Sequence, residues 1–467
     1  MLNKLLPLVL CGALSGCSLI PDYLRPDLPV AAQWPGEATG AAGQRKATAT
    51  DWQAFFPDPR LQQLIVAALE HNRDLKIAAA RLQEARALYG ISRADRLPNL
   101  DLTASGSSAK TPADLSPSGK ETIGRRYDAG LALLSFELDL WGRIRSLNAA
   151  ALANYLASEE AARALRLSLV AEVANAYLIL LELDERSALA RETVRTRAEM
   201  RGMIDRRREV GLASDLDYLQ AESIYQQARS DLASLERQRS AASNAMILLV
   251  GKLPAELPAG CALDAQAIAS DLAPGLPAET LLERPDVLAA EQRLIAANAN
   301  IGAARAAFLP RISLLGAAGS ASRALSGLFA GDSDAWAFQP VLRLPLFDFG
   351  RASANLDLAE ARKVVAVAEY EKTIQQAFRE IADLLAARTS LAAQLQAQQE
   401  VERNQSQRLN LARARYEAGI SSYLEVLDAE RDAFNARQGV LQLQRAVLVA
   451  AAQLYKALGG GAPSAKD

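Results

Sequence analysis

The sequence predicts a mainly α-helical fold with a small β part, and three observations support this. Half of the 467 residues are hydrophobic but only 5% are aromatic, so the apolar content is mainly Ala and Leu, which favours helices. Four very long runs are almost free of Gly and Pro. Short stretches elsewhere alternate apolar and polar residues, which is typical of strands.

An internal repeat organises the chain. Gly142-Arg143 recurs as Gly350-Arg351, and Gly211 recurs as Gly419, each pair being 208 positions apart. A constant offset over such a distance indicates tandem copies of one structural unit. We therefore divide the chain into a signal peptide (1–16), an N-terminal extended segment (17–60), a first repeat (61–260), a second repeat (261–460) and a tail (461–467).

Each repeat is predicted to contain one helix of ordinary length, followed later by two exceptionally long ones. The first helices are expected at 61–91 and 278–307. The runs 143–210 and 351–418 have 68 residues each, which at 1.5 Å per residue would reach about 100 Å. Lateral packing must stabilise such helices. The return helices are expected at 212–250 and 420–458, where Val440, Leu443 and Val447 show coiled-coil spacing.

Period-two patterning predicts a β-hairpin in each repeat, at 97–141 and 309–349, with polar loops at 105–124 and 316–333. Strands can cross a membrane only as a closed barrel, because open edges leave backbone groups unpaired in lipid. Four strands cannot close a barrel, and eight would give an interior filled by side chains. Twelve strands from three chains are the smallest count that leaves a duct. The alternative is a pair of soluble hairpins that cap a structural periplasmic coiled coil without a channel.

The first seventeen residues are predicted to be an export signal. Lys4 precedes a short apolar stretch, 5–13, that is too short to span a bilayer. Leu14-Ser15-Gly16-Cys17 resembles the lipobox of bacterial lipoproteins, which implies cleavage before Cys17 and its acylation. An ordinary signal peptide with an incidental Cys is the alternative. Cys261 would remain as a single Cys beyond the anchor, so the mature chain has no internal disulfide.

The composition argues against several classes of protein. Charges are balanced, with 52 Lys and Arg against 54 Asp and Glu, so a nucleic-acid partner is not expected. The single histidine, His71, leaves almost no material for a His-based catalytic or metal site. The sequence also lacks a nucleophile elbow and a phosphate-binding loop. We therefore expect no enzyme activity, cofactor or metal.

Motifs along the whole mature chain resemble the TolC/OprM family of outer-membrane efflux channels, and most closely its NodT-type RND lipoprotein branch. The resemblance implies a homotrimer with a twelve-strand transmembrane β-barrel and a twelve-helix periplasmic coiled-coil barrel. It implies a lipid-anchored exit duct in the outer membrane, partnered by a periplasmic adaptor protein and an inner-membrane efflux pump of the RND type. The motifs are 17–26, Trp52, Phe55, 58–61, 97–98, 139–143, 283–287, 308–310, 348–351, 416–431 and 454–461.

The resemblance also assigns candidate site residues. Leu424 and Asp428 would form apolar and acidic rings at a periplasmic gate, which Tyr416 and Arg431 would hold closed. The alternative for Asp428 and Arg431 is an ordinary surface pair three residues apart. The equivalent positions of the first repeat lack the acid and the Arg. Adaptor contacts are expected at two turns, Gly211-Leu212 and Gly419-Ile420, where each Gly also fits a helix C-cap.

Overall fold

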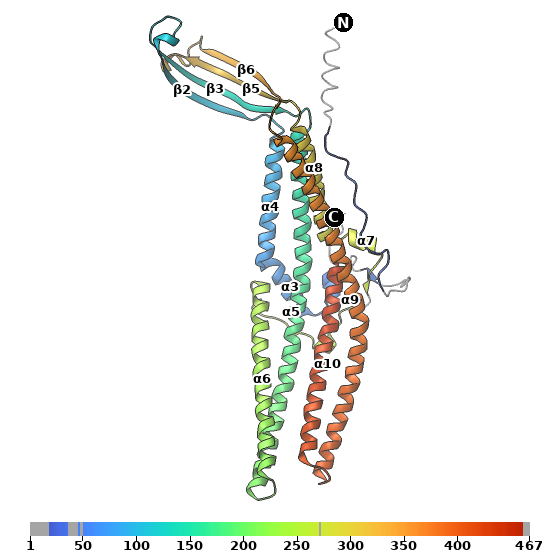
Figure 1. Ribbon diagram of the computed structural model, residues 1–467. Helices are drawn as coiled ribbons and strands as arrows, with labels where there is room; N and C mark the ends of the chain where they lie inside the picture. The colour runs from blue at the N-terminus through green and yellow to red at the C-terminus, as the bar shows by residue number, and fades with distance from the viewer. Residues whose placement is uncertain (1–17, 36–44, 47–49, 270–271, 461–467) are drawn as a thin grey trace. The chain divides into compact units, whose positions relative to one another are not determined.

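The computed structural model describes residues 18–35, 45–46, 50–269 and 272–460, and its chain forms two compact units (Figure 1). The strand unit contains 18–27, 81–159 and 289–371, and the bundle unit contains the described residues of 28–80, 160–288 and 372–460. Each unit therefore combines matching parts of both repeats. Cys17 and the tail lie outside the described residues.

Four long helices dominate the chain, as predicted. Helices α5 (Arg143–Glu209) and α9 (Arg351–Glu417) have 67 residues each. Helices α6 (Asp215–Val250) and α10 (Tyr423–Ala457) run back from them. The return helices begin three residues later than expected, because the turns between the helices take those residues.

A carboxylate fixes the start of each 67-residue helix. Asp139 accepts hydrogen bonds from the backbone N–H groups of Ile144 and Arg145, both at 2.9 Å. Asp348 does the same for Gly350 and Ala352, at 3.0 and 2.8 Å. These bonds satisfy N–H groups that have no partner inside the helix.

The prediction of one helix at the start of each repeat is wrong, because each segment forms two helices. In the first repeat, α3 (Pro59–His71) follows the short α2 (Trp52–Phe55) and is separated from α4 (Arg73–Ala94) by Asn72. The Asn72 side chain accepts from the N–H of Leu75 at 3.0 Å and donates to the carbonyl of Leu249 at 2.8 Å. In the second repeat, α7 (Pro277–Leu282) ends before α8 (Pro285–Ala306), since Pro285 has no N–H to continue a helix.

The strand unit contains one antiparallel sheet of four strands in the order β2-β3-β5-β6. Its strands are β2 (Leu100–Thr111), β3 (Thr122–Leu138), β5 (Arg311–Ser322) and β6 (Asp334–Arg343). Pairing of β3 with β5 joins the two predicted hairpins. The expected loops were too long, because the strands continue through Gly- and Ser-rich residues. At Gly130 and Gly319, which pair directly, any Cβ would lie within 2.5 Å of the opposite backbone.

A β-bulge explains a change of phase in the sequence pattern. The apolar residues of β3 occupy odd positions up to Leu133 and even positions from Phe136 onward. Between these two residues the register shifts, so that Leu134 and Ser135 lie opposite Leu315. The extra residue keeps both apolar series on one face of the sheet.

The register separates an apolar face from a polar face. One row across the four strands contains Leu102, Leu131, Ala318 and Trp336. Leu102 and Trp336 are 82% and 81% exposed in the single chain. Since successive side chains of a strand point to opposite faces, the intervening positions form the second face. These positions include Asp101, Thr103, Ser105, Asp128, Glu137, Ser313, Gln339 and Arg343.

In the bundle unit, a buried carboxylate joins the start of α3 to α5 and to the segment that connects α6 with α7. Asp58, only 2% exposed, caps α3 by accepting from the N–H of Arg60 at 2.9 Å. It also accepts from the Tyr177 hydroxyl, the Gln266 amide and the N–H of Cys261, at 2.8, 2.7 and 3.0 Å. Burial raises the pKa of Asp58, but these hydrogen bonds outweigh burial and hold the pKa below its ordinary value.

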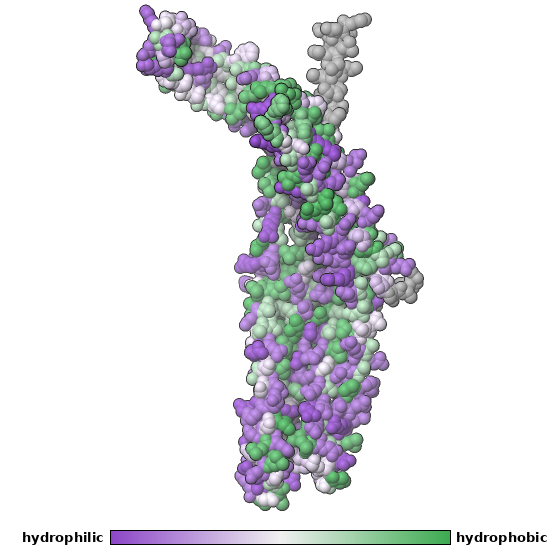
Figure 2. All heavy atoms as spheres, viewed as in Figure 1, coloured by the Kyte–Doolittle hydropathy of each residue, from purple (hydrophilic) through white to green (hydrophobic). Residues whose placement is uncertain are grey.

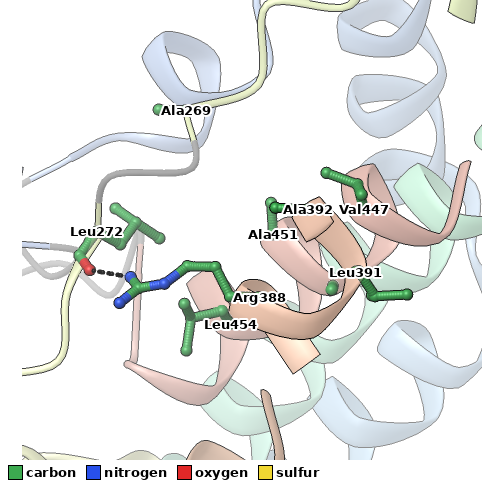
Figure 3. A pocket seen from close by; sticks show the side chains of 9 residues that line it. Ala269, Leu272, Arg388, Leu391, Ala392, Val447, Ala451 and Leu454 are labelled. Atoms are coloured by element: carbon green, nitrogen blue, oxygen red, sulfur yellow. Dashed lines mark hydrogen bonds between the residues drawn. The ribbon is translucent and has the colours of Figure 1, made fainter. Parts of the chain in front are cut away.

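The segment that connects α6 with α7 also packs on α9 and α10 (Figure 3). Arg388 of α9 donates to the carbonyl of Leu272 at 3.0 Å. Leu272 belongs to β4 (Leu272–Ala273), which pairs in parallel with β1 (Arg45–Lys46). Beside this contact is an apolar cavity of ≈ 190 Å³, lined by residues that include Leu391, Val447 and Leu454.

Among the described helices, α5 is the one long and apolar enough by composition to cross a membrane. Its apolar residues include Val173, Ala174 and Leu178, which have no exposed surface. Burial of these side chains in the bundle unit accounts for part of the apolar stretch, since 39% of its 18-residue window is buried.

We predict that Asp58→Asn will lower the unfolding free energy by about 2–3 kcal/mol, because it replaces a buried, charged acceptor of four hydrogen bonds. Because the folded pKa of Asp58 is depressed, its contribution is present above the ordinary pKa and is lost as the pH falls through the folded value. Thermal unfolding between about pH 3 and 7 should therefore show a shallower acid decline in the variant. The control is Asp114→Asn, which changes an exposed carboxylate. Equal thermal unfolding midpoints for the two variants would contradict the stabilising role of Asp58.

Candidate functional site

Two turns of the same geometry end the long helices of the bundle unit. Gly211 and Gly419 have φ values of 76° and 71°, in the left-handed region. The N–H of Leu212 donates to the carbonyl of Arg207 at 2.7 Å, and that of Gly211 to Arg208 at 2.9 Å. The turn at Gly419 repeats both bonds, with Ile420 to Arg415 and Gly419 to Tyr416, each at 2.9 Å. Both glycines are thus the C′ residues of Schellman motifs, one position after the helix C-cap.

The two turns expose apolar side chains. Val210, Leu212 and Ile420 are 69%, 71% and 70% exposed. Figure 2 shows hydrophobic side chains at the surface of the ends of α6 and α10, where these turns lie. The turns differ at the following helix, since Ser214 forms a capping box with Asp217 whereas Ser422 makes no side-chain cap.

Next to the turns, residues of all four long helices share one hydrophobic cluster. From α10 the cluster takes Tyr423, Val426 and Leu427, together with Ala429. The buried stripe of α10 therefore leaves the opposite face exposed. The cluster also contains Ile204 of α5, Ala221 of α6 and Ala412 of α9.

Three of the four predicted gate residues lie on the exposed face of α10. Leu424 is 49% exposed, and the side chains of Asp428 and Arg431 are 43% and 59% exposed. Their spacing of four and three residues places them on one side of the helix. The structure thus brings these three side chains together, away from the shared cluster.

Arg431 forms ion pairs along its own helix, at 3.1 Å to both Asp428 and Asp432. Asp432 also accepts from Arg408 of α9 at 2.8 Å. Burial raises the pKa of Asp432, but the hydrogen bonds from Arg408 and Arg431 outweigh burial and lower the pKa. Exposed pairs of this kind contribute about 0–1 kcal/mol, so in one chain the Asp428–Arg431 pair behaves as an ordinary surface pair.

Tyr416, the fourth predicted residue, connects the two repeats. Its hydroxyl accepts from Arg207 of α5 at 2.9 Å, and its ring lies 5.5 Å from that of Tyr423. Tyr416 therefore links the end of α9 to the end of α5 within one chain.

Sequence reasoning missed several cross-helix pairs. Arg413 of α9 pairs with Glu430 of α10 at 2.8 Å. Glu182 of α5, whose side chain is 6% exposed, accepts from Arg186 at 2.9 Å and also pairs with Arg445 of α10. No local pattern predicted the pairs between helices, because each partner resembles a surface charge and only the packing of the helices brings the partners together.

The described residues contain no group of three or more His, Cys, Asp or Glu side chains that could hold a metal ion. The arrangement at the helix ends instead offers exposed apolar turns beside exchangeable ion pairs. These features suit protein contacts and changes of helix position.

We predict that Gly211→Ala will destabilise the protein by about 1–2 kcal/mol, because Ala is strained at positive φ. Gly202 is the matched control, since it lies inside α5 with open space around its Cα. Gly202→Ala should stabilise the helix by about 0.5–1 kcal/mol. Thermal unfolding measures both effects, and shifts of the same sign for both variants would refute the assignment.

Comparison with known proteins identifies the family. The family model described as outer membrane efflux protein matches residues 64–252 and again 276–460. The solvent efflux pump outer membrane protein SrpC of Pseudomonas putida is 48% identical over 469 residues, which cover 98% of both chains. The outer membrane protein OprJ of Pseudomonas aeruginosa is 46% identical over 466 residues, which cover 97% of this chain and 95% of OprJ.

Solved structures agree with this result. The open state of the Neisseria gonorrhoeae MtrE outer membrane channel aligns with a TM-score of 0.87 at 39% identity, covering 95% of this chain and 98% of that one. The Campylobacter jejuni CmeC outer membrane channel aligns with a TM-score of 0.90 at 28% identity, covering 97% and 96%. The chain therefore belongs to the outer membrane efflux protein family and is an outer-membrane efflux channel.

Proposed function

We propose that three copies of this chain form one exit duct, which passes compounds from an inner-membrane pump and a periplasmic adaptor across the periplasm and the outer membrane. The observation that carries the proposal is the four-stranded sheet, with one apolar face, one polar face and two edge strands. In a barrel, the apolar face would meet lipid and the polar face would line the duct.

The sheet topology supports closure between copies. Strands β2, β3, β5 and β6 alternate in direction, so β6 of one copy can pair antiparallel with β2 of the next. Two copies would supply eight strands, whose interior side chains fill. Three copies supply twelve and leave an open lumen. A structural coiled-coil lipoprotein, the rival function, gives no reason for an apolar face and a polar face on this sheet.

We further propose that acylated Cys17 anchors the chain in the outer membrane. The residues that follow it are bound within the strand unit, on α8. Glu291 accepts from Arg25 at 2.7 and 2.9 Å and from the Tyr23 hydroxyl at 3.0 Å. Asn298 donates to the carbonyl of Pro21 at 2.7 Å. An anchor at Cys17 would thus be tied to the unit that carries the strands.

The exposed face of α10 supports a periplasmic gate at Leu424, Asp428 and Arg431. In a trimer, three copies of Asp428 around one axis would repel one another, and Arg431 would offset that repulsion. Tyr416, through Arg207, would hold α9 in the closed arrangement. A closed end of this kind can have two stable arrangements.

We expect Asp428→Ala and Arg431→Ala to loosen the closed end and raise single-channel conductance in planar lipid bilayers. Arg195→Ala is the matched control, because Arg195 also makes exposed ion pairs with acids of its own helix, α5. Unchanged conductance in both gate variants would count against the gate, and absence of any conductance in the unaltered protein would refute the channel itself.

The exposed turns support contact with a periplasmic adaptor. Val210, Leu212 and Ile420 project from capped turns that need no further packing partner to form. Because these turns are already ordered, their apolar side chains can dock on another protein with little loss of conformational entropy. We infer that the partner pump is of the RND type and that the chain itself transports without catalysis.

A charge on either turn should interfere with adaptor binding. We expect Leu212→Asp and Ile420→Asp to reduce drug or solvent export in a complementation assay, while trimers still form, because both side chains are exposed. Gln407→Asp places the same charge on an exposed position of α9 and should leave export unchanged. Normal export in both turn variants would sink the contact hypothesis.

A further inference from the structure

The bundle unit contains a second surface feature, a cleft of ≈ 660 Å³ between α3 and the residues that follow α6. Trp52, Gln63 and Val66 line one side, and Lys252 and Leu253 line the other. The cleft shares no residue with the gate or the turns. The cleft is open to solvent and so resembles a surface groove.

The walls of this cleft are fixed by hydrogen bonds and close backbone contact. The Gln62 amide donates to the carbonyls of Gln53 and Phe56, both at 2.9 Å, and so ties α3 to α2. Asn72 joins the end of α3 to the last turn of α6 through the carbonyl of Leu249. A Cβ on Gly251 would lie only 2.6 Å from the carbonyl oxygen of His71, so the two walls meet closely. The two walls of the cleft are therefore fixed relative to each other.

The chemistry of the lining is mixed and close to neutral. Trp52, Val66 and Leu253 provide apolar surface. The amides of Gln53 and Gln63 each offer both a donor and an acceptor. Glu70 and Lys252 oppose each other in charge, so the cleft does not favour an anion or a metal cation.

A saccharide matches this lining better than other classes of ligand. A pyranose ring has an apolar C–H face that suits an indole ring, and its hydroxyl groups both donate and accept hydrogen bonds. An acetamido group adds an amide that pairs well with a Gln side chain. A free hydrocarbon would leave the amides unpaired, and a charged ligand would find no net charge.

We propose that this cleft binds a glycan of N-acetylated sugars, the chemistry of cell-wall glycan strands. The choice of glycan rests on the proposed function, which places the bundle unit in the periplasm. Trp52 would stack on a sugar ring, and Gln63 would bond its acetamido group. Binding would hold the duct in the cell wall.

The test uses the full-length protein in detergent and three probes: tetra-N-acetylchitotetraose, cellotetraose and tetra-alanine. Isothermal titration calorimetry should detect binding of chitotetraose. It should detect weaker binding of cellotetraose and no binding of the peptide. Trp52→Ala and Gln63→Ala should each weaken chitotetraose binding by about tenfold. Gln407→Ala, an exposed Gln on α9, is the matched control and should bind normally.

Gln63 is exposed, so its variant tests the site even if Trp52→Ala fails to fold. No chitotetraose binding, unchanged binding in Gln63→Ala, or a preference for the peptide would each overturn the proposal. Single-channel conductance tests the proposed function separately from the glycan site. A trimer that conducts but does not bind chitotetraose refutes the glycan site alone. A protein that binds chitotetraose but never conducts refutes the duct alone.

Discussion

The outer edges of β2 and β6 are the constraint on which the assembly depends. Within the described chain, these two strands end the sheet, and their outward N–H and C=O groups have no strand partner. The same sheet has an apolar face with Leu102 and Trp336 exposed. In lipid, an unpaired backbone group costs several kcal/mol, so edges of ten and twelve residues cannot remain open. The sheet therefore needs neighbouring copies.

The tandem repeat supplies matching parts, and long-range polar contacts join them. Asp58 and Gln266 lie 208 residues apart and bond directly. In the same unit, Glu182 of α5 in the first repeat, whose side chain is 6% exposed, pairs with Arg445 of α10 in the second. Each compact unit combines residues of both repeats. The two repeats are therefore interleaved and do not form one domain each.

The sequence was most informative where one residue type decides the backbone. The 67-residue helices follow from runs without Pro, and their ends follow from Gly211 and Gly419. The strands were predicted from alternation, and their faces follow from it once the bulge after Leu133 is known. Where tertiary contacts decide, prediction was poorer. Asn72 interrupts a helix because its side chain reaches Leu249, which lies 177 residues away.

The candidate site shows the same contrast between what the sequence predicts and what tertiary contacts decide. The candidates Leu424, Asp428 and Arg431 came from the family resemblance, and their spacing along the helix agrees with the exposed face of α10 on which the structure places them. The partners of Tyr416 and Asp432, Arg207 and Arg408, required the packed helices. Length, charge and periodicity do not specify which helices become neighbours. These bonds could therefore not be predicted from the sequence.

The claim that three chains complete one barrel is tested most directly by the mass of the intact complex. Native mass spectrometry of the protein extracted from outer membranes counts the copies without assuming a shape. The account predicts three copies, because three four-stranded sheets are the fewest that close around an open duct. A complex of one, two or four copies would contradict it.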